Sequence, residues 1–212
     1  FVFDATPGPL APAMKNELSG IKQTARSTWG EQQLFTQGEK KIYLDGRYVD
    51  PAFLTMFELN FISGSATSAF KEIYAVVLTE KAAIKLFGHV NVLGSLVKVN
   101  ATENGMVSGV IKDLPTNCSF QFEWLAPFAA FERKNDWLQG WGSNSILTYA
   151  ELFPGTNLAG VNKQLYNFVG NKSGSNAKMS LYPMDRWRLY NNFDKSGHEI
   201  DGRLRFVRLF GI

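Results

Sequence analysis

The segment Ile73–Gly88 constrains the fold more than any other part of the sequence. Its first six residues have the composition of a buried strand, with alanine, valine and leucine in succession. Thr79 and Glu80 then favour a helix start, because a threonine side chain accepts hydrogen bonds from first-turn amides and an acidic residue complements the positive helix end. Gly88 suits the left-handed residue that ends a helix. We therefore predict a strand, a capped helix and a stop within sixteen residues.

The N-terminal quarter predicts one helix followed by short strands. After the breaker Pro7-Gly8-Pro9, apolar residues recur at helical spacing and predict an amphipathic helix of about three turns that ends at Gly20. The residues of this apolar face are Leu10, Met14, Leu18 and Ile21. From residue 21 to 50 the pattern becomes strand-like, with turns predicted at Gln37-Gly38 and Asp45-Gly46. An Asp-Gly pair between such segments is a strong hairpin signal.

The rest of the chain alternates between the two kinds of element. We expect helical segments at 53–57 and 158–168 and a further helix that starts from Pro127. Strands are expected at 96–99, 106–111, 120–124 and 146–153. A turn is expected at 103–105 and a loop at 137–142. The order strand, turn, helix, strand recurs near each end, without a sequence repeat of fixed period. This mixture predicts an α+β protein.

Composition fits a folded domain or two. The chain has 212 residues, of which 45% are apolar, 14% aromatic and 19% charged, and this excludes a disordered tail, a collagen-like repeat and a coiled coil. The longest unbroken apolar stretch, Ile73 to Leu78, is far shorter than the roughly 20 residues of a membrane span. The formal net charge of only +3 argues against a nucleic-acid surface.

No pattern of catalytic or ligand-binding residues emerges. The two histidines, His89 and His198, have no partners at metal-ligand spacing, and Cys118 is the only cysteine. The sequence contains neither a phosphate-binding loop, nor a dinucleotide fingerprint, nor a serine in a nucleophile-elbow frame. We therefore predict no catalytic residue, no metal and no cofactor, and an uncharacterised hydrolase remains the third-ranked hypothesis.

The aromatic residues leave a second hypothesis open. Rings that could together line a sugar-binding face are Trp124, Trp137, Trp141, Trp187, Tyr182 and Tyr190. Burial of large rings in a core is the more ordinary explanation. A secreted or surface carbohydrate-binding module is therefore the alternative to the interpretation that follows, and it requires exposed tryptophans.

Several motifs in collinear order resemble a known family. They include residues 6–17 (TPGPLAPAMKNE), 49–53 (VDPAF), 77–88 (VLTEKAAIKLFG) and 107–115 (VSGVIKDLP), with further matches at 148–152, 181–189 and 205–210. Together they resemble the extracytoplasmic domain of ABC transporter permeases of the MacB and FtsX type, in particular a Bacteroidetes-like branch. The resemblance spans nearly the whole chain.

The resemblance implies a specific architecture. The family fold is an α+β porter-like lobe formed from both chain ends, with a β-rich lobe inserted between them. On this sequence it implies a porter-like lobe of residues 1–50 and 117–195, an inserted lobe of residues 51–116, and a membrane-proximal return segment of residues 196–212. In the family this domain lies between two transmembrane helices, so we expect membrane spans to flank the chain.

The resemblance also implies a mechanical, non-catalytic role. Such domains lie on the periplasmic side of the bacterial inner membrane, and their permeases pair with a separate cytoplasmic ATPase. A dimer of permeases and a periplasmic adaptor are the further expected partners, and the work is efflux, substrate extrusion or signalling. Because contacts concentrate on loops, Trp137 and Trp141 are the candidate partner-contact residues.

Overall fold

The computed structural model describes residues 2–190, 192–194 and 197–203, so most of the predicted return segment lies outside the described residues. The chain forms two compact units, which are considered separately. One unit is Thr6–Pro154, and the other contains residues 2–5 and the described residues from Gly155 onward. Among the described residues, no helix combines the length and the apolar character needed to cross a bilayer.

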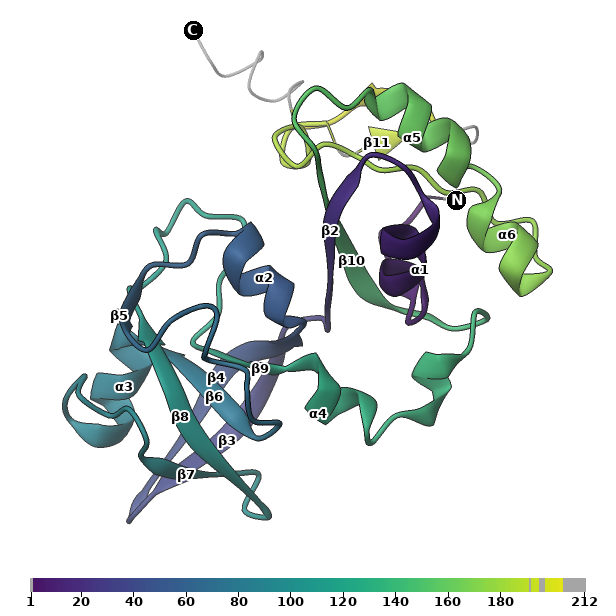
Figure 1. The fold of residues 1–212 in the computed structure, drawn as a ribbon. Coiled ribbons are helices and arrows are strands. Elements are labelled where there is room, and N and C mark those ends of the chain that lie inside the picture. The colour runs from purple at the N-terminus through teal and green to yellow at the C-terminus, as the bar shows by residue number, and fades with distance from the viewer. Residues whose placement is uncertain (1, 191, 195–196, 204–212) are drawn as a thin grey trace, which may run out of the picture. The chain divides into compact units, whose positions relative to one another are not determined.

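The Thr6–Pro154 unit begins with a three-stranded antiparallel sheet and one helix (Figure 1). The strands lie in the order β1 (Thr6–Pro7), β10 (Asn144–Leu152) and β2 (Ile21–Ser27), and α1 (Leu10–Glu17) packs beside β2 and β10. The predicted helix ends earlier than expected, because Leu18 is already extended and Gly20 has a φ of +87°. Ile21 is buried as the first residue of β2 and not on the helix face.

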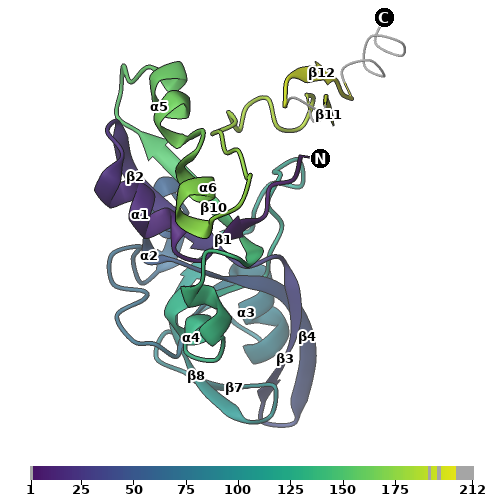
Figure 2. The same cartoon turned by 90° about the vertical axis from the view of Figure 1, so that its right-hand side faces the viewer.

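The larger part of this unit is a closed ring of strands. Consecutive pairing runs through β4 (Lys40–Val49), β3 (Glu31–Gln37), β7 (Leu96–Val99), β8 (Glu103–Ile111), β6 (Ala75–Thr79) and β9 (Trp124–Pro127). Parallel pairing of β9 with β4 closes the ring, and β5 (Phe61–Ser63) adds to β8. Figure 2 shows β3 and β4 as a long curved hairpin along one side. We call this ring the barrel.

Two predicted turns prove to be wrong. The β3–β4 hairpin turns at residues 38–39, where Gly38 has a φ of +57°, whereas Asp45-Gly46 lies inside β4. Gly46 serves close packing, because a Cβ there would be 2.3 Å from the Trp124 carbonyl oxygen. The β7–β8 turn falls at residues 100–102 and not at 103–105, since Asn100 and Ala101 adopt positive φ.

The predicted strand–helix unit at residues 73–88 is confirmed. β6 leads directly into α3 (Glu80–Phe87), and the Thr79 hydroxyl accepts a hydrogen bond from the Ala82 amide at 3.3 Å. Gly88 has a φ of +87° and ends the helix. The buried residues of α3 contact β3, β4, β6 and β8, so the helix contributes to the barrel core.

Trp124 fills the barrel interior. It is 1% exposed, and its indole Nε1 donates to the Leu44 carbonyl oxygen at 2.9 Å. Phe35 and Tyr48 contact its ring, with centroids 5.8 and 5.2 Å away. Phe120 and Phe122 are buried as their alternation predicts, although the β9 strand begins only at Trp124.

The remaining helices of this unit are short. The helical segment predicted at 53–57 lies in α2 (Pro51–Met56) and its C-terminal end, with Asp50 at the N-cap, and α4 (Phe128–Glu132) follows β9 immediately after Pro127, as predicted. The predicted loop from Trp137 begins inside a 3₁₀ helix, η1 (Asp136–Gln139). The division predicted at residues 51 and 116 stays a prediction; hydrogen bonding joins β5–β8 to β3 and β9 in the same sheet system.

The second unit is built from small elements. Its helices are α5 (Leu158–Leu165) and α6 (Phe168–Ser173), and its strands β11 (Asn192–Phe193) and β12 (Glu199–Asp201) pair antiparallel. The single predicted helix at 158–168 is therefore interrupted before Phe168. Arg186 pairs with Glu199 at 2.5 Å, and the Tyr182 hydroxyl donates to Glu199 at 2.8 Å.

Candidate functional site

The two predicted contact residues lie near the start of the segment leading to β10. Trp137 belongs to η1 and is 41% exposed, while its indole Nε1 donates to the Asn135 side-chain oxygen at 2.9 Å. Its ring meets Phe131 edge-on, with centroids 6.2 Å apart. Trp141 is half-buried in the loop that follows. Trp137 thus offers an oriented, partly exposed ring on a short helix.

The aromatic residues of the carbohydrate hypothesis do not form an exposed platform. Trp124 is buried in the barrel and cannot stack on a sugar. In the second unit the Tyr182 hydroxyl donates to the Tyr190 carbonyl oxygen at 2.6 Å, and Arg186 lies over the Tyr190 ring at 4.3 Å. These rings support local structure, so the carbohydrate hypothesis is not favoured.

The most elaborate polar arrangement lies where β2 meets the end of β4. Backbone pairing places Ser27 opposite Val49. The Thr28 amide donates to the Tyr48 carbonyl oxygen at 2.9 Å, and the Tyr48 amide donates to the Thr28 hydroxyl at 3.1 Å. This junction joins the three-stranded sheet to the barrel within the Thr6–Pro154 unit.

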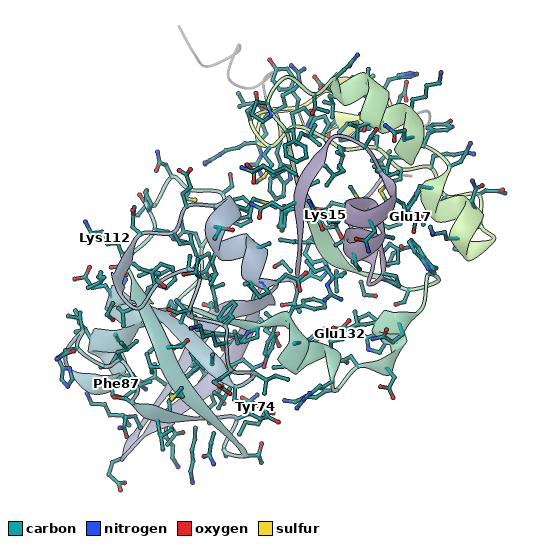
Figure 3. The ribbon with its side chains drawn as sticks, in the orientation of Figure 1. Lys15, Glu17, Tyr74, Phe87, Lys112 and Glu132 are labelled. Carbon is teal, nitrogen blue, oxygen red and sulfur yellow. The ribbon has the colours of Figure 1, made fainter. Side chains whose placement is uncertain are left out.

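One arginine holds the junction together. The Arg26 guanidinium binds both oxygens of Asp50, with Nε–Oδ2 and Nη2–Oδ1 distances of 2.9 and 3.1 Å, and reaches Glu132 Oε1 at 2.7 Å. We call these three residues the Arg26 cluster. Glu132 projects from the end of α4 (Figure 3), so the cluster ties together β2, the start of α2 and α4.

The ion pairs of the Arg26 cluster are partly shielded from water. The Arg26 side chain is 14% exposed and lies 4.2 Å over the Phe128 ring. Burial alone lowers the pKa of Arg26, but hydrogen bonds and charge attraction from Asp50 and Glu132 outweigh it, so the pKa lies above its usual value. Asp50 stands at the N-cap of α2 yet does not cap it, because its carboxylate is committed to Arg26.

An aromatic cluster forms the apolar side of the same junction. Its members are Phe53, Phe57, Phe120 and Tyr149. Their ring centroids lie 4.4 to 5.8 Å apart, mostly edge to face, which is the favoured geometry for aromatic pairs. The rings come from α2, the segment before β9, and β10. The ion pairs and the packed rings thus both involve α2, the ion pairs at its start and the rings at Phe53 and Phe57.

The Arg26 cluster and the aromatic cluster hold elements of the fold together. A pocket of about 30 Å³ in the barrel, lined by Phe35, Tyr48 and Trp124 among others, has room for little more than a water molecule. Among the residues that the structure describes, no group of three or more His, Cys, Asp and Glu could hold a metal ion.

The sequence did not reveal the Arg26 cluster. Its members are 24 and 106 positions from Arg26, so no local spacing connects them. Asp50-Pro51 was a recognisable helix start, and this was the one available signal. It indicated where the helix begins and nothing about the partner of the Asp50 carboxylate, which binds Arg26.

Comparison with known proteins decides the family. The family model described as MacB-like periplasmic core domain matches residues 2–167. The chain belongs to this family. The MacB-like resemblance drawn from the sequence motifs, and with it the mixed α and β fold, is thereby confirmed.

Solved structures of MacB-like domains agree. A domain described as part of a permease protein from Porphyromonas gingivalis aligns with a TM-score of 0.68 and 26% identity, covering 80% of this chain and 79% of that one. The periplasmic region of MacB from Actinobacillus actinomycetemcomitans aligns with a TM-score of 0.64 and 17% identity, covering 84% and 80%.

The likeness extends to Gram-positive bacteria. The extracellular domain of the noncanonic ABC-type transporter YknZ aligns with a TM-score of 0.63 and 16% identity, covering 84% of this chain and 90% of that one. At such identities the second and third structures show the fold alone. No curated protein matches the chain.

Proposed function

We propose that this chain is the extracytoplasmic domain of an ABC transporter permease subunit on the periplasmic side of the bacterial inner membrane. It is non-catalytic and couples the ATP-driven motion of a separate cytoplasmic ATPase to efflux, substrate extrusion or signalling. The observation that carries the proposal is the family match over residues 2–167. The similar solved domains, described as parts of a permease, of MacB and of a transporter, support it.

The junction supports a mechanical role. A domain that relays motion must move as a connected body, and the Arg26 cluster with the aromatic cluster fastens the barrel to the three-stranded sheet. We further propose that two permeases pair in the full transporter and that a periplasmic adaptor contacts the Trp137 and Trp141 region.

The test measures motion in the full-length permease reconstituted with its ATPase. Cys118 is changed to serine, and a single cysteine replaces the exposed Lys40 near the tip of the β3–β4 hairpin to carry a spin label. We expect the distance between labels on two permeases, measured by pulsed electron paramagnetic resonance, to change with ATP and to stay constant with a hydrolysis-deficient ATPase. A permease that purifies without an ATPase, or a distance that ATP leaves unchanged, refutes the proposal.

The contact residues need a separate measurement. Trp137→Ala combined with Trp141→Ala should lower adaptor binding or transport while the circular dichroism of the domain stays the same. Tyr43→Ala is the control, because Tyr43 is an exposed ring on β4, far along the chain from both tryptophans. Unchanged binding and transport in the double variant would end this part of the proposal.

A further inference from the structure

Arg47 is a half-buried cation on β4 that lacks an acidic partner. Its Nε atom is buried and has no hydrogen-bond partner. Within the described part of the chain, no carboxylate lies within ion-pair distance of it, although Asp45 precedes it by two positions on the same strand. The Phe120 ring lies 5.6 Å from its guanidinium carbon. The guanidinium therefore loses water contacts, and none of the described carboxylates supplies it with an opposite charge.

The lack of an acidic partner distinguishes Arg47 from Arg26, the other arginine of this region. Arg26, on the neighbouring strand β2, has two carboxylates at 2.9 and 2.7 Å. Burial lowers the pKa of Arg47, and the Tyr149 hydroxyl counteracts this only in part. Desolvated charges are costly unless an opposite charge compensates them, and a hydroxyl and an aromatic ring supply less compensation than the two carboxylates of Arg26.

An exposed tryptophan lies in the segment that passes this cation. Ser27 pairs with Val49 and Glu31 pairs with Gly46, so the three residues between them, Thr28 to Gly30, lie opposite the two residues Arg47 and Tyr48. Trp29 is 46% exposed, and it directly precedes Gly30, where a Cβ would lie 3.7 Å from Arg47 Nη2. An exposed apolar ring is therefore within one residue of the backbone beside the guanidinium.

Gly30 leaves the approach to Arg47 open. A Cβ at Gly30 would lie 3.7 Å from Arg47 Nη2, which is an ordinary contact distance, and Gly30 is exposed. Because glycine has no side chain, no side chain at position 30 covers Nη2. Since Nε is buried, Nη2 is the donor that we expect an oxygen atom from outside the protein to reach.

We propose that Arg47 and Trp29 form a docking site for an aspartate or glutamate side chain of a partner polypeptide, with an apolar residue next to that acid resting on Trp29. A carboxylate is the planar acceptor that a guanidinium binds best. The tryptophan argues for a polypeptide over a free anion, since a small inorganic anion makes no use of an apolar ring. Tryptophan and arginine are also the residues that dominate protein-interface energies.

The test is a titration of the isolated 212-residue chain and does not depend on the transporter proposal. The probe is the peptide acetyl-Gly-Leu-Glu-Leu-Gly-amide, and its control carries Gln in place of Glu. Nuclear magnetic resonance follows the Arg47 Nε–H and Trp29 indole signals. We expect both signals to shift with the Glu peptide, with a dissociation constant of about 1 mM, and neither to shift with the Gln peptide.

Three variants sharpen the result. Arg47→Gln should weaken binding about tenfold. Gly30→Asp should abolish it, because the new carboxylate can reach Arg47 Nη2 from within the chain, whereas Gly30→Ala should bind like the unchanged protein. The Gly30 pair keeps the test valid even if Arg47→Gln does not fold.

Other occupants would overturn the proposal in distinct ways. Equal binding of the Gln peptide refutes the role of the acid. Shifts of Arg47 with inorganic phosphate as large as those with the Glu peptide indicate a free-anion site. Shifts of both residues on raising the protein concentration alone indicate a second copy of this chain. Full binding by Gly30→Asp would contradict the assigned geometry.

Discussion

Replacing Gly46 with alanine should unfold part of the barrel, because the residue lies directly under Trp124. The new Cβ would be 2.3 Å from the Trp124 carbonyl oxygen and 2.4 Å from two ring carbons. Relief requires a shift of about 1 Å, since ordinary contacts begin near 3.4 Å. The obstructing atoms include backbone, so rotating the side chain alone cannot remove the clash.

The expected cost follows from what this shift disturbs. Gly46 and Trp124 are paired in the β4–β9 register that closes the barrel. Overpacking in a core costs about 1–3 kcal/mol, and disruption of a buried hydrogen bond adds about 1 kcal/mol. We therefore expect Gly46→Ala to lower the free energy of unfolding by about 3 kcal/mol, or the melting temperature by about 6–12 °C.

Urea unfolding followed by tryptophan fluorescence measures this loss. Gly142→Ala is the matched control, because a Cβ at Gly142 meets nothing within 4 Å, and it should change stability by less than about 0.5 kcal/mol. Adding Trp124→Leu to Gly46→Ala should rescue little, since the contact with the carbonyl oxygen persists. A Gly46→Ala protein within about 1 kcal/mol of the unchanged chain would refute the close-packing argument.

Three further predictions concern polar groups in the same unit. Trp124→Phe should lower the free energy of unfolding by about 1–3 kcal/mol in urea titrations, because the Leu44 carbonyl oxygen loses its indole donor. Arg26→Met should lower it by about 2–4 kcal/mol by leaving Asp50 and Glu132 unpaired, whereas Lys22→Met, which breaks an exposed pair with Glu151, should cost less than about 1 kcal/mol. Burial raises the pKa of Glu31 above its usual value, so the folded state holds this proton more tightly than the unfolded chain does, and the free energy of unfolding falls as the pH rises through the raised pKa. Glu31→Gln should therefore stabilise the protein at pH 7 more than at pH 4. An equal effect at both pH values would contradict this.

Sequence patterns correctly predicted those helix starts and ends that neighbouring residues determine. Thr79 caps α3 and Gly88 ends it because neighbouring amides and a single backbone angle decide both. Asp50-Pro51 likewise starts α2 through its own backbone preferences. Trp137 and Trp141 were chosen as contact residues because they lie in a predicted loop; the structure places Trp137 on η1, and their role as contact residues stays a prediction.

The features missed have causes far away in the sequence. Gly46 looked like a turn residue, and its actual constraint comes from Trp124, 78 positions later on the partner strand. Closure of the barrel depends on β9 returning beside β4 in parallel, which no pattern within either strand specifies. Arg26 and Arg47 are both arginines in polar stretches, and only three-dimensional placement separates the paired from the unpaired one.

Closure of the barrel also limits how it can be recognised. A strand whose hydrogen-bonding groups face open solvent can take up an added strand from another protein, as many peptide-binding domains do. In the ring from β4 through β3, β7, β8 and β6 to β9, each strand has a neighbour on both sides over part of its length. Where these strands are paired on both sides, a partner must therefore recognise the barrel through side chains and turns, and mutations that alter such binding should change surface chemistry and leave backbone pairing intact.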